Sequence, residues 1–453
     1  MRTITIQLLS SVLFLSVFIF NPSSHAQWEI LGERNFLPGE TFRHGLQFKV
    51  AEGTPYIAYV DIQDNRNIKV LKYNGNDWDL IGQESIPTGR VSYPSLLIHE
   101  GLIYLAYQDL DFDDKSSLIR YDGVSWDYVG QRGFSEGEAR FQSVVIHNNE
   151  PYVAFEDVTQ SRESTVMKYN GSDWVIVGNP GFTSGISDGQ SIYNQIVTNQ
   201  EELYIIFCSV HITMGEKTWI MKFEDETWST VGNSGFRNAG GARQSLVFLN
   251  NEPYCTYLNF SNSKAAVKKY NGNQWVTVGQ LGLSEGLAPS PTMHIHNDIP
   301  YVAYSDFSED TKLTVMYLDG DNWAPLGGIG VSPADITLPE IEGYENTIYV
   351  AFIDAQNPNP GNVTIMTYDL LTTVDDRLTE ISQFDIFPNP ASEHLTISTT
   401  ETIDFISIVS LEGRLIKRSK TTNHIDLDGI PKGTYLLQIK TDKGTGYKRF
   451  VKR

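Results

Sequence analysis

A five-residue pattern, Trp-x-x-Val/Ile/Leu-Gly, recurs along this chain at a nearly constant interval. Its copies begin at Trp28, Trp78, Trp126, Trp174, Trp228, Trp275 and Trp323, separated by 50, 48, 48, 54, 47 and 48 residues. A fixed period of this length indicates one supersecondary unit copied in tandem, in which each copy buries its apolar faces against its neighbours. The chain is therefore restricted to a repeat architecture.

A second pattern keeps step with the first. It is a tyrosine among apolar residues, as in PYIAY, and its copies lie at 55–59, 103–107, 151–155, 203–207, 253–257, 300–304 and 348–352. The two patterns are out of phase, because the first tryptophan motif precedes every tyrosine motif and no tryptophan motif follows the last one. This offset indicates how the two ends of the array meet.

Each copy predicts a four-stranded antiparallel meander. In the copy at 91–131, the apolar runs lie at 95–99, 102–109, 117–121 and 125–130. The last two runs are joined by Asp-Gly, which suits a tight hairpin that needs positive φ at both central residues. The runs are almost continuously apolar, so both faces of each sheet are expected to be covered. Small sheets of this kind, arranged radially, form a β-propeller.

The count of strands predicts how the array closes. Six complete copies lie within residues 42–328, whereas the seventh has three strands within 339–368 and lacks a tryptophan strand. The isolated motif at 28–32 can supply that strand and leave no unpaired sheet edge. The predicted fold class is therefore all-β: a seven-bladed β-propeller over 27–370, closed by an N-terminal strand and followed by a small β-sandwich.

Residues 1–26 have the features of a signal peptide. Arg2 provides positive charge, residues 8–20 are apolar, and Ser24-His25-Ala26 forms a small-x-small cleavage site. The apolar run is too short to be preferred as a membrane span, and no other segment approaches the roughly 20 apolar residues that a spanning helix needs. We expect an exported mature protein without a transmembrane segment.

The two cysteines, Cys208 and Cys255, occupy different offsets of the tyrosine motif in neighbouring copies. Different offsets place the two residues at different positions along their strands and so separate them. We therefore expect two buried thiols rather than a disulfide.

The charge of the chain excludes one class of partner. The formal net charge is −21, from 34 basic and 55 acidic residues. Residues 384–453 hold 11 of the basic and 8 of the acidic residues, so the remainder holds 23 and 47 and has a net charge of −24. Such an acidic body repels phosphate backbones, which excludes nucleic acid as a partner.

A different module follows the repeats. A polar linker at 371–383 leads into 384–453, where alternating strands are broken by turns, as in a small all-β domain. The module resembles, over its whole length, the C-terminal sorting domain of the bacterial type IX secretion system. The matching motifs are Phe387-Pro388-Asn389-Pro390, Leu411-Glu412-Gly413, Gly433-Thr434-Tyr435 and the basic end at 448–453.

This resemblance implies where the protein is exported and does not imply an activity. Members of the family are carried across the outer membrane by the type IX secretion machinery, and the module is usually cut off. The body is then released or tethered to surface lipopolysaccharide. We therefore expect a secreted or cell-surface protein of a Bacteroidetes-type bacterium, with the secretion machinery as a partner.

Two loops match the G-x-S-x-G pattern of serine hydrolases, around Ser135 and Ser284. A nucleophile elbow needs a strand before the serine and a helix after it. Both loops instead join the last strand of one copy to the first strand of the next, and variants recur at Gly181 and Gly235. We predict structural turns and no catalytic serine.

Metal and cofactor sites are not predicted. The short polar residues that end the second strand of each copy are expected to bond their own turns: Asp61, Asp109, Asp157, Ser209, Asn259, Asp306 and Asp354. Bound Ca²⁺ is the alternative, because the loop at 109–114 offers several carboxylates. His294 and His296 have ligand spacing but lack a third ligand, so zinc is not predicted.

Propellers bind ligands where their loops converge at the central channel. Structural positions repeat between copies, whereas a site for an asymmetric ligand should break the pattern. The residues that lead into the first strand of each copy therefore predict a binding cluster of aromatic platforms and cations, suited to an acidic sugar chain: His44, Tyr93, Arg140, Tyr193 and Arg243. The alternative is that these are ordinary loop-edge residues.

Two functions fit these features. We favour a non-catalytic binding protein for polysaccharide or for another protein, because the copies are regular and lack long insertions. The alternative is an extracellular polysaccharide-degrading enzyme, a lyase or a glycoside hydrolase, with its site at the channel. A lyase would need a base such as His44 or Tyr93 facing an arginine, and a hydrolase would need two carboxylates across the channel. The fold alone does not choose.

Overall fold

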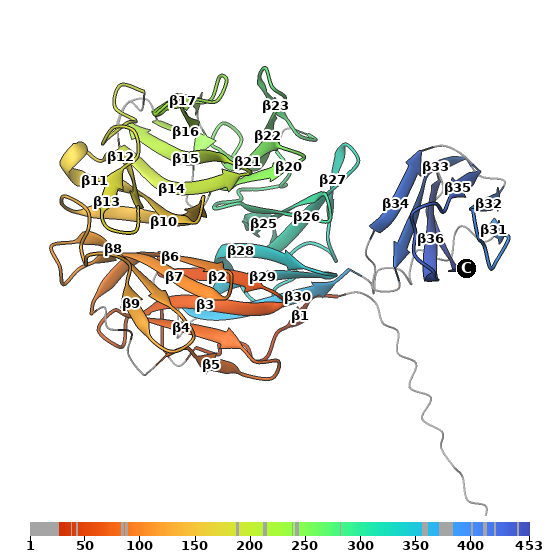
Figure 1. The fold of residues 1–453 in the computed structure, drawn as a ribbon, viewed down its shortest axis with the longest axis horizontal. Coiled ribbons are helices and arrows are strands. Elements are labelled where there is room, and N and C mark those ends of the chain that lie inside the picture. Colours follow the sequence, from red (N-terminus) through yellow and green to blue (C-terminus); the bar gives the residue numbers. More distant parts are fainter. Residues whose placement is uncertain are drawn as a thin grey trace, which may run out of the picture.

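The computed structural model describes residues 27–37, 39–41, 44–82, 86, 89–186, 190–211, 215–237, 239–240, 244–280, 282–355, 361–370, 384–399, 402–410, 415–420, 423–441 and 444–453. This part of the chain consists of small antiparallel sheets (Figure 1), with two short 3-10 turns, η1 (Val158–Gln160) and η2 (Phe307–Glu309). The predicted all-β class is confirmed. The predicted signal peptide at 1–26 and linker at 371–383 lie outside the described residues.

Within 27–370 the described residues form seven sheets, each a meander from an inner first strand to an outer last strand. The first three comprise β2 (Leu46–Ala51), β3 (Thr54–Asp61), β4 (Asn67–Tyr73) and β5 (Trp78–Leu80); β6 (Val91–His99), β7 (Leu102–Asp109), β8 (Lys115–Tyr121) and β9 (Trp126–Tyr128); and β10 (Ala139–His147), β11 (Glu150–Asp157), β12 (Glu163–Tyr169) and β13 (Trp174–Ile176).

The fourth to sixth sheets follow in chain order. They comprise β14 (Gln190–Asn199), β15 (Glu202–His211), β16 (Gly215–Glu224) and β17 (Thr227–Thr230), with β18 (Phe236–Arg237) beside β16; β19 (Ala239–Gly240), β20 (Leu246–Leu249), β21 (Glu252–Asn259), β22 (Lys264–Tyr270) and β23 (Trp275–Thr277); and β24 (Thr292–His296), β25 (Ile299–Asp306), β26 (Lys312–Asp319) and β27 (Asn322–Pro325).

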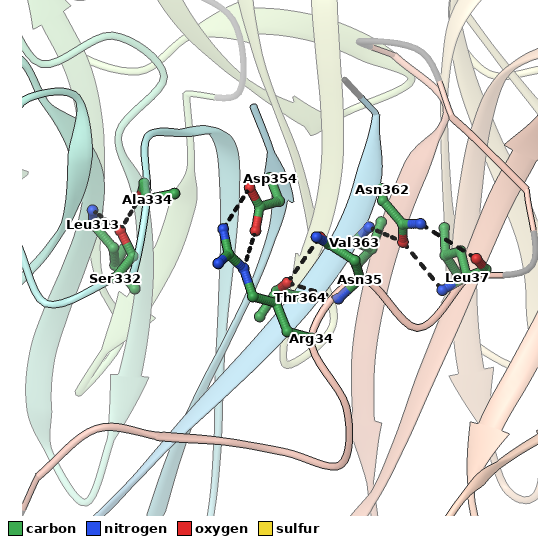
Figure 2. A network of polar contacts seen from close by, with 10 residues as sticks. All are labelled: Arg34, Asn35, Leu37, Leu313, Ser332, Ala334, Asp354, Asn362, Val363 and Thr364. Carbon is green, nitrogen blue, oxygen red and sulfur yellow. Dashed lines mark hydrogen bonds and ion pairs between the residues drawn. The ribbon is translucent and has the colours of Figure 1, made fainter. Parts of the chain in front are cut away.

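The seventh sheet takes its strands from both ends of the array. It consists of β28 (Ile336–Tyr344), β29 (Thr347–Asp354), β30 (Asn362–Asp369) and β1 (Glu29–Ile30), which pairs antiparallel with β30. Figure 2 shows how the segment after β1 continues along β30, where the backbone N–H of Asn35 donates to the Thr364 hydroxyl at 3.2 Å. The pairing of the N-terminal motif with the last repeat is therefore observed.

The tryptophan motif has a physical reason. In five sheets the indole N–H donates to the carbonyl three residues after the preceding sheet's tryptophan, as from Trp323 to Val278 at 3.0 Å. The motif glycine lies under the next tryptophan: a Cβ on Gly279 would come within 2.6 Å of the Trp323 ring. Trp28 continues this series, because its indole donates to the Leu326 carbonyl at 2.8 Å.

Neighbouring first strands are joined by side chains that accept backbone N–H groups. Ser95 of β6 accepts from Val144 of β10 at 3.1 Å, and Glu340 of β28 accepts from Phe48 of β2 at 2.6 Å. Strand β2 lies beside both β6 and β28. The first and seventh sheets also share an apolar cluster that includes Phe48 and Val363.

The C-terminal residues form a separate core between two sheets. One sheet contains β31 (Phe384–Phe387), β32 (His394–Thr399) and β35 (His424–Asp426), and the other contains β34 (Leu415–Lys420), β33 (Ile403–Ser410), β36 (Gly433–Thr441) and β37 (Gly444–Lys452). Leu395 of the first sheet and Leu437 and Phe450 of the second are fully buried in one cluster. The module is a small two-sheet sandwich, as predicted.

Both cysteines are buried and form no disulfide, as expected from their offsets. Burial raises the pKa of the Cys255 thiol to about 12, so this thiol stays protonated at neutral pH.

Candidate binding site

The loops that join consecutive sheets meet the loops after the second strands at one end of the first strands, which we call the loop end. Two backbone hydrogen bonds define it: Leu110 N–H donates to the Arg90 carbonyl at 3.0 Å, and Val158 N–H donates to the Glu138 carbonyl at 3.1 Å. Loops from different copies are thereby held next to the inner strands.

The aspartates that end the second strands stabilise these loops. Asp157 accepts the Thr159 N–H at 3.0 Å and the Thr165 hydroxyl at 2.9 Å, and Asp306 accepts from Ser308 and Thr314 in the same way. Asp109 accepts the equivalent bond from the Ser117 hydroxyl at 3.3 Å and two further bonds from Arg132, at 2.7 and 2.9 Å. The observed bonds support the structural interpretation of these carboxylates.

The serines of the two G-x-S-x-G loops have structural partners. Ser135 is buried, accepts the Ser116 N–H at 2.9 Å and donates to the Gly137 carbonyl at 2.7 Å. Ser284 makes the equivalent bonds, accepting from Ala265 at 3.1 Å and donating to Gly286 at 2.8 Å. Because each hydroxyl is engaged on both sides by backbone, these loops are structural turns.

His294 and His296, which have ligand spacing but were not predicted to bind zinc, belong to contacts between the sixth and seventh sheets. The His294 Nδ1 atom lies 3.5 Å from a Glu342 carboxylate oxygen, and the His296 Nε2 atom lies 2.7 Å from the Glu345 carbonyl. Among the described residues, no three His, Cys, Asp or Glu side chains come together as a metal site requires.

A β-bulge re-aims one side chain near the start of several first strands. The register breaks between Ser92 and Ser95 in β6, and the equivalent breaks occur in β10, β14 and β28. The bulged residues have positive φ, an uncommon conformation for a bulky residue: 47° at Tyr93, 53° at Phe141, 56° at Tyr193 and 52° at Leu338. Such strained positions often mark functional sites.

The bulges bring the rings of Tyr93, Phe141 and Tyr193 together, and His44, just before β2, joins them; we call these four rings the aromatic cluster. Tyr93 and Phe141 have ring centroids 4.4 Å apart, and Phe141 and Tyr193 have centroids 4.9 Å apart. The His44 ring lies 5.8 Å from both tyrosine rings and 6.0 Å from Phe141. All four side chains are partly exposed, so the cluster offers ring surface to a ligand.

Two ion pairs adjoin the aromatic cluster. Arg140 precedes Phe141 and contacts the Glu138 carboxylate at 2.5 Å, while Arg162 contacts the buried Glu156 at 2.5 Å. Burial raises the pKa of the Tyr93 hydroxyl, and the charges of Arg140 and Glu156 act on that pKa in opposite directions. Tyr93 therefore lies within electrostatic reach of both pairs.

The structure brings together three of the five predicted site residues, His44, Tyr93 and Tyr193, in direct ring contact. Arg140 lies beside them, but its guanidinium is paired with Glu138. Arg243 lies outside the described residues. Phe141 was missed because the charged Arg140 was chosen from the same strand entry. The sequence did contain a signal for Phe141. When the residues that lead into the first strands are aligned, Tyr93, Phe141 and Tyr193 fall at the same position.

The predicted sorting motif fastens the start of the C-terminal module to its last strand. The Asn389 side chain donates to the Arg449 carbonyl at 3.1 Å and accepts the Val451 N–H at 3.0 Å. Phe387, two residues earlier, is half exposed. The Asn389 side chain therefore bonds backbone groups of β37 as a neighbouring strand would.

Residues 385–453 match the family model of the secretion system C-terminal sorting domain. The resemblance noted from the sequence is confirmed, and it implies handling by the type IX secretion machinery. The protein is exported, and it is secreted or attached to the cell surface. The described part of the chain contains no helix with the length and apolar character needed to cross a membrane.

The body is similar in fold to a solved carbohydrate-active enzyme. The structure of polysaccharide lyase Uly1 has a TM-score of 0.50 at 10% sequence identity, covering 77% of this chain and 95% of that chain. An ulvan lyase bound to -[GlcA(1-4)Rha3S]- gives 0.47 at 12% identity, over 73% and 96%. The Aleuria aurantia lectin with α-methyl-L-fucoside gives 0.38 at 13%, over 60% and 93%. No curated protein sequence matches the chain.

Proposed function

We propose that the seven sheets form a seven-bladed β-propeller over residues 27–370, completed by the N-terminal strand. The pairing of β1 with β30, the position of β2 between β6 and β28, and the hydrogen bond from Phe48 to Glu340 support this architecture. A linker at 371–383 and the sorting domain at 384–453 follow in this proposal.

We propose that the exported body is a non-catalytic protein that binds polysaccharide at the loop end. The observation that carries this proposal is the aromatic cluster, in which side chains from four consecutive sheets meet beside the Arg140–Glu138 pair. Partly exposed rings stack on the apolar faces of sugars, and adjacent polar groups fix the orientation of the hydroxyls. A protein ligand is the other outcome that a binding test can reveal.

The lyase alternative is less well supported by the electrostatics. A lyase needs a base facing an arginine, whereas the Arg140 guanidinium is paired with Glu138, and burial raises the pKa of Tyr93, one of the two candidate bases. A hydrolase needs two carboxylates that are available to act as acid and base or nucleophile. The two carboxylates beside the cluster, Glu138 and Glu156, are each bonded to an arginine.

A binding panel with matched variants tests this function. The mature protein and its Tyr93→Ala and Tyr193→Ala variants would be measured against neutral, uronate and sulfated polysaccharides, and the products assayed for unsaturated or reducing ends. We expect binding by the mature protein, a loss of about tenfold in each variant from lost stacking, and no products. Phe307→Ala is the control, because Phe307 is an exposed aromatic residue that directly follows β25 of the sixth sheet and lies outside the aromatic cluster.

Products released from any polysaccharide would overturn the non-catalytic assignment. Binding that neither tyrosine variant alters would place the site elsewhere. A complete absence of binding would remove polysaccharide as the ligand.

A further inference from the structure

Among the described arginines of the loop end, Arg66 donates to the Ser92 hydroxyl at 3.2 Å, whereas most are paired with carboxylates. Five of them lie within 2.5–2.8 Å of an acidic partner: Arg34 with Asp354, Arg90 with Asp111, Arg132 with Asp109, Arg140 with Glu138 and Arg162 with Glu156. Residues 1–383 carry a net charge of −24 by the sequence count. These described residues therefore do not form the uncompensated cationic patch that attracts a polyanion.

The Arg140–Glu138 pair presents both charges to solvent. The Arg140 side chain is 33% exposed and the Glu138 side chain is 29% exposed, so a ligand can reach donor and acceptor side by side. Arg162 is held differently, because its partner Glu156 is fully buried and lies opposite Arg140 in the β10–β11 pairing. A second carboxylate, neutralised by Arg162, therefore lies behind Arg140.

Uncharged polar groups follow two of the rings in the chain. Gln142 comes directly after Phe141, and Asn194 directly after Tyr193; their side chains are 6% and 7% exposed. The Gln142 Oε1 and Asn194 Nδ2 atoms are buried without a hydrogen-bond partner among the described residues. Buried polar atoms of this kind are uncommon and are often explained by a bound group or by a functional role.

We propose that the ligand is an uncharged sugar chain, held by neighbouring hydroxyl groups that bridge the Arg140 guanidinium and the Glu138 carboxylate. This inference rests on the proposed function and names its ligand class. A hydroxyl can accept from a guanidinium and donate to a carboxylate at once. The carboxylate of a uronate, or a sulfate group, cannot donate to Glu138 and must displace this carboxylate to reach Arg140. The ligand thus differs from the acidic sugar expected from the sequence.

Replacement of Glu138 by Gln separates the two ligand classes by the sign of its effect. For a neutral sugar, Glu138→Gln removes a charged acceptor, and affinity should fall about tenfold or more. For an anionic sugar, the same change releases Arg140 from its carboxylate, and affinity should rise. Asp111→Asn is the matched control, because it removes the carboxylate of an exposed pair outside the aromatic cluster.

The experiment titrates the mature protein and both variants with neutral polysaccharides (mannan, xylan and β-glucan), uronates (alginate and polygalacturonate) and dextran sulfate, at low and high salt. We expect neutral chains to bind with little dependence on salt, Glu138→Gln to weaken them, and Asp111→Asn to have no effect. Selective binding of uronate or sulfate that salt weakens and Glu138→Gln strengthens would overturn the inference while leaving the proposed function in place. Binding of no polysaccharide would refute both.

Discussion

Arg34 and Asp354 form a two-point ion pair although 320 positions separate them in the chain. The Arg34 Nε atom donates to one Asp354 oxygen at 2.7 Å, and Nη2 donates to the other at 3.2 Å (Figure 2). In the second sheet, Arg132 makes the same bidentate contact with Asp109, only 23 positions away. Each arginine lies six residues after its motif tryptophan, so the N-terminal segment does for the seventh sheet what an internal loop does for the second.

Replacing Arg34 by Ala should destabilise the body by about 2–4 kcal/mol, because it leaves the Asp354 carboxylate, only 2% exposed, without its charged partner. Arg90→Ala is the matched control, since Arg90 and Asp111 are 47% and 38% exposed and such surface pairs contribute about 1 kcal/mol or less. Urea unfolding of both variants measures the difference. Equal effects would show that the N-terminal pair contributes no more than a surface pair.

Trp28→Ala should cost as much stability as Trp323→Ala. Both indoles donate to a carbonyl of the preceding sheet, at 2.8 and 3.0 Å, and both are at least 90% buried. Removal of such a side chain costs about 3–5 kcal/mol. Thermal and urea unfolding would be compared for the two variants. A Trp28→Ala protein that unfolds like the wild type would refute completion of the seventh sheet by the N-terminus.

Removal of residues 384–453 should prevent export beyond the outer membrane while leaving the body folded. The C-terminal module has its own core and matches the sorting-domain family. Its loss should therefore remove the secretion signal and leave the fold of the body unchanged. Cell fractionation locates the protein, and the circular dichroism and melting of the purified body test its folding. Normal amounts of the shortened protein outside the cell would contradict the assignment.

Acidification should weaken the body through two buried histidines. Burial lowers the pKa values of His147 and His296, so the folded state binds protons less readily than the unfolded state. The stability that they contribute is present above the unfolded pKa of about 6.5 and is lost as the pH falls through the folded pKa. Unfolding free energies at about pH 7.5 and pH 5 would measure the loss.

The double variant His147→Gln, His296→Gln should show a smaller loss between the two pH values. The control is His99→Gln, at the equivalent position of the second sheet. An undiminished loss in the double variant would assign the pH dependence to other groups.

The repeat could be predicted because the residues that join neighbouring copies recur at a nearly fixed spacing. Each motif tryptophan needs a glycine four residues after the preceding tryptophan, and Gly82 beneath Trp126 shows this spacing directly. Tyr93 and Tyr193 could be found because they interrupt the repeated pattern. Phe141 was overlooked because the charged residue beside it, Arg140, was favoured, although Phe141 aligns with Tyr93 and Tyr193 in the strand entries. The Arg140–Glu138 pair could not be predicted, because the repeat pattern places Arg140 at the strand entry without showing that Glu138 lies against it.

Two substitutions at Phe141 separate its role in binding from its role in stability. The Phe141 ring lies between Tyr93 and Tyr193, and its backbone has a φ of 53°. Phe141→Gly and Phe141→Ala both remove the ring and should loosen both tyrosines, so both should bind polysaccharide about tenfold more weakly. Glycine adopts positive φ without strain, so the glycine variant should be more stable than the alanine variant by about 1 kcal/mol.

Binding titrations and urea unfolding of the two Phe141 variants measure the two roles separately. Equal affinity with unequal stability is the expected result, because the ring acts on the ligand site and the backbone strain acts on the fold. Affinities that follow the stabilities would show instead that the variants lose binding through general unfolding. Unchanged affinity in both variants would remove Phe141 from the binding site.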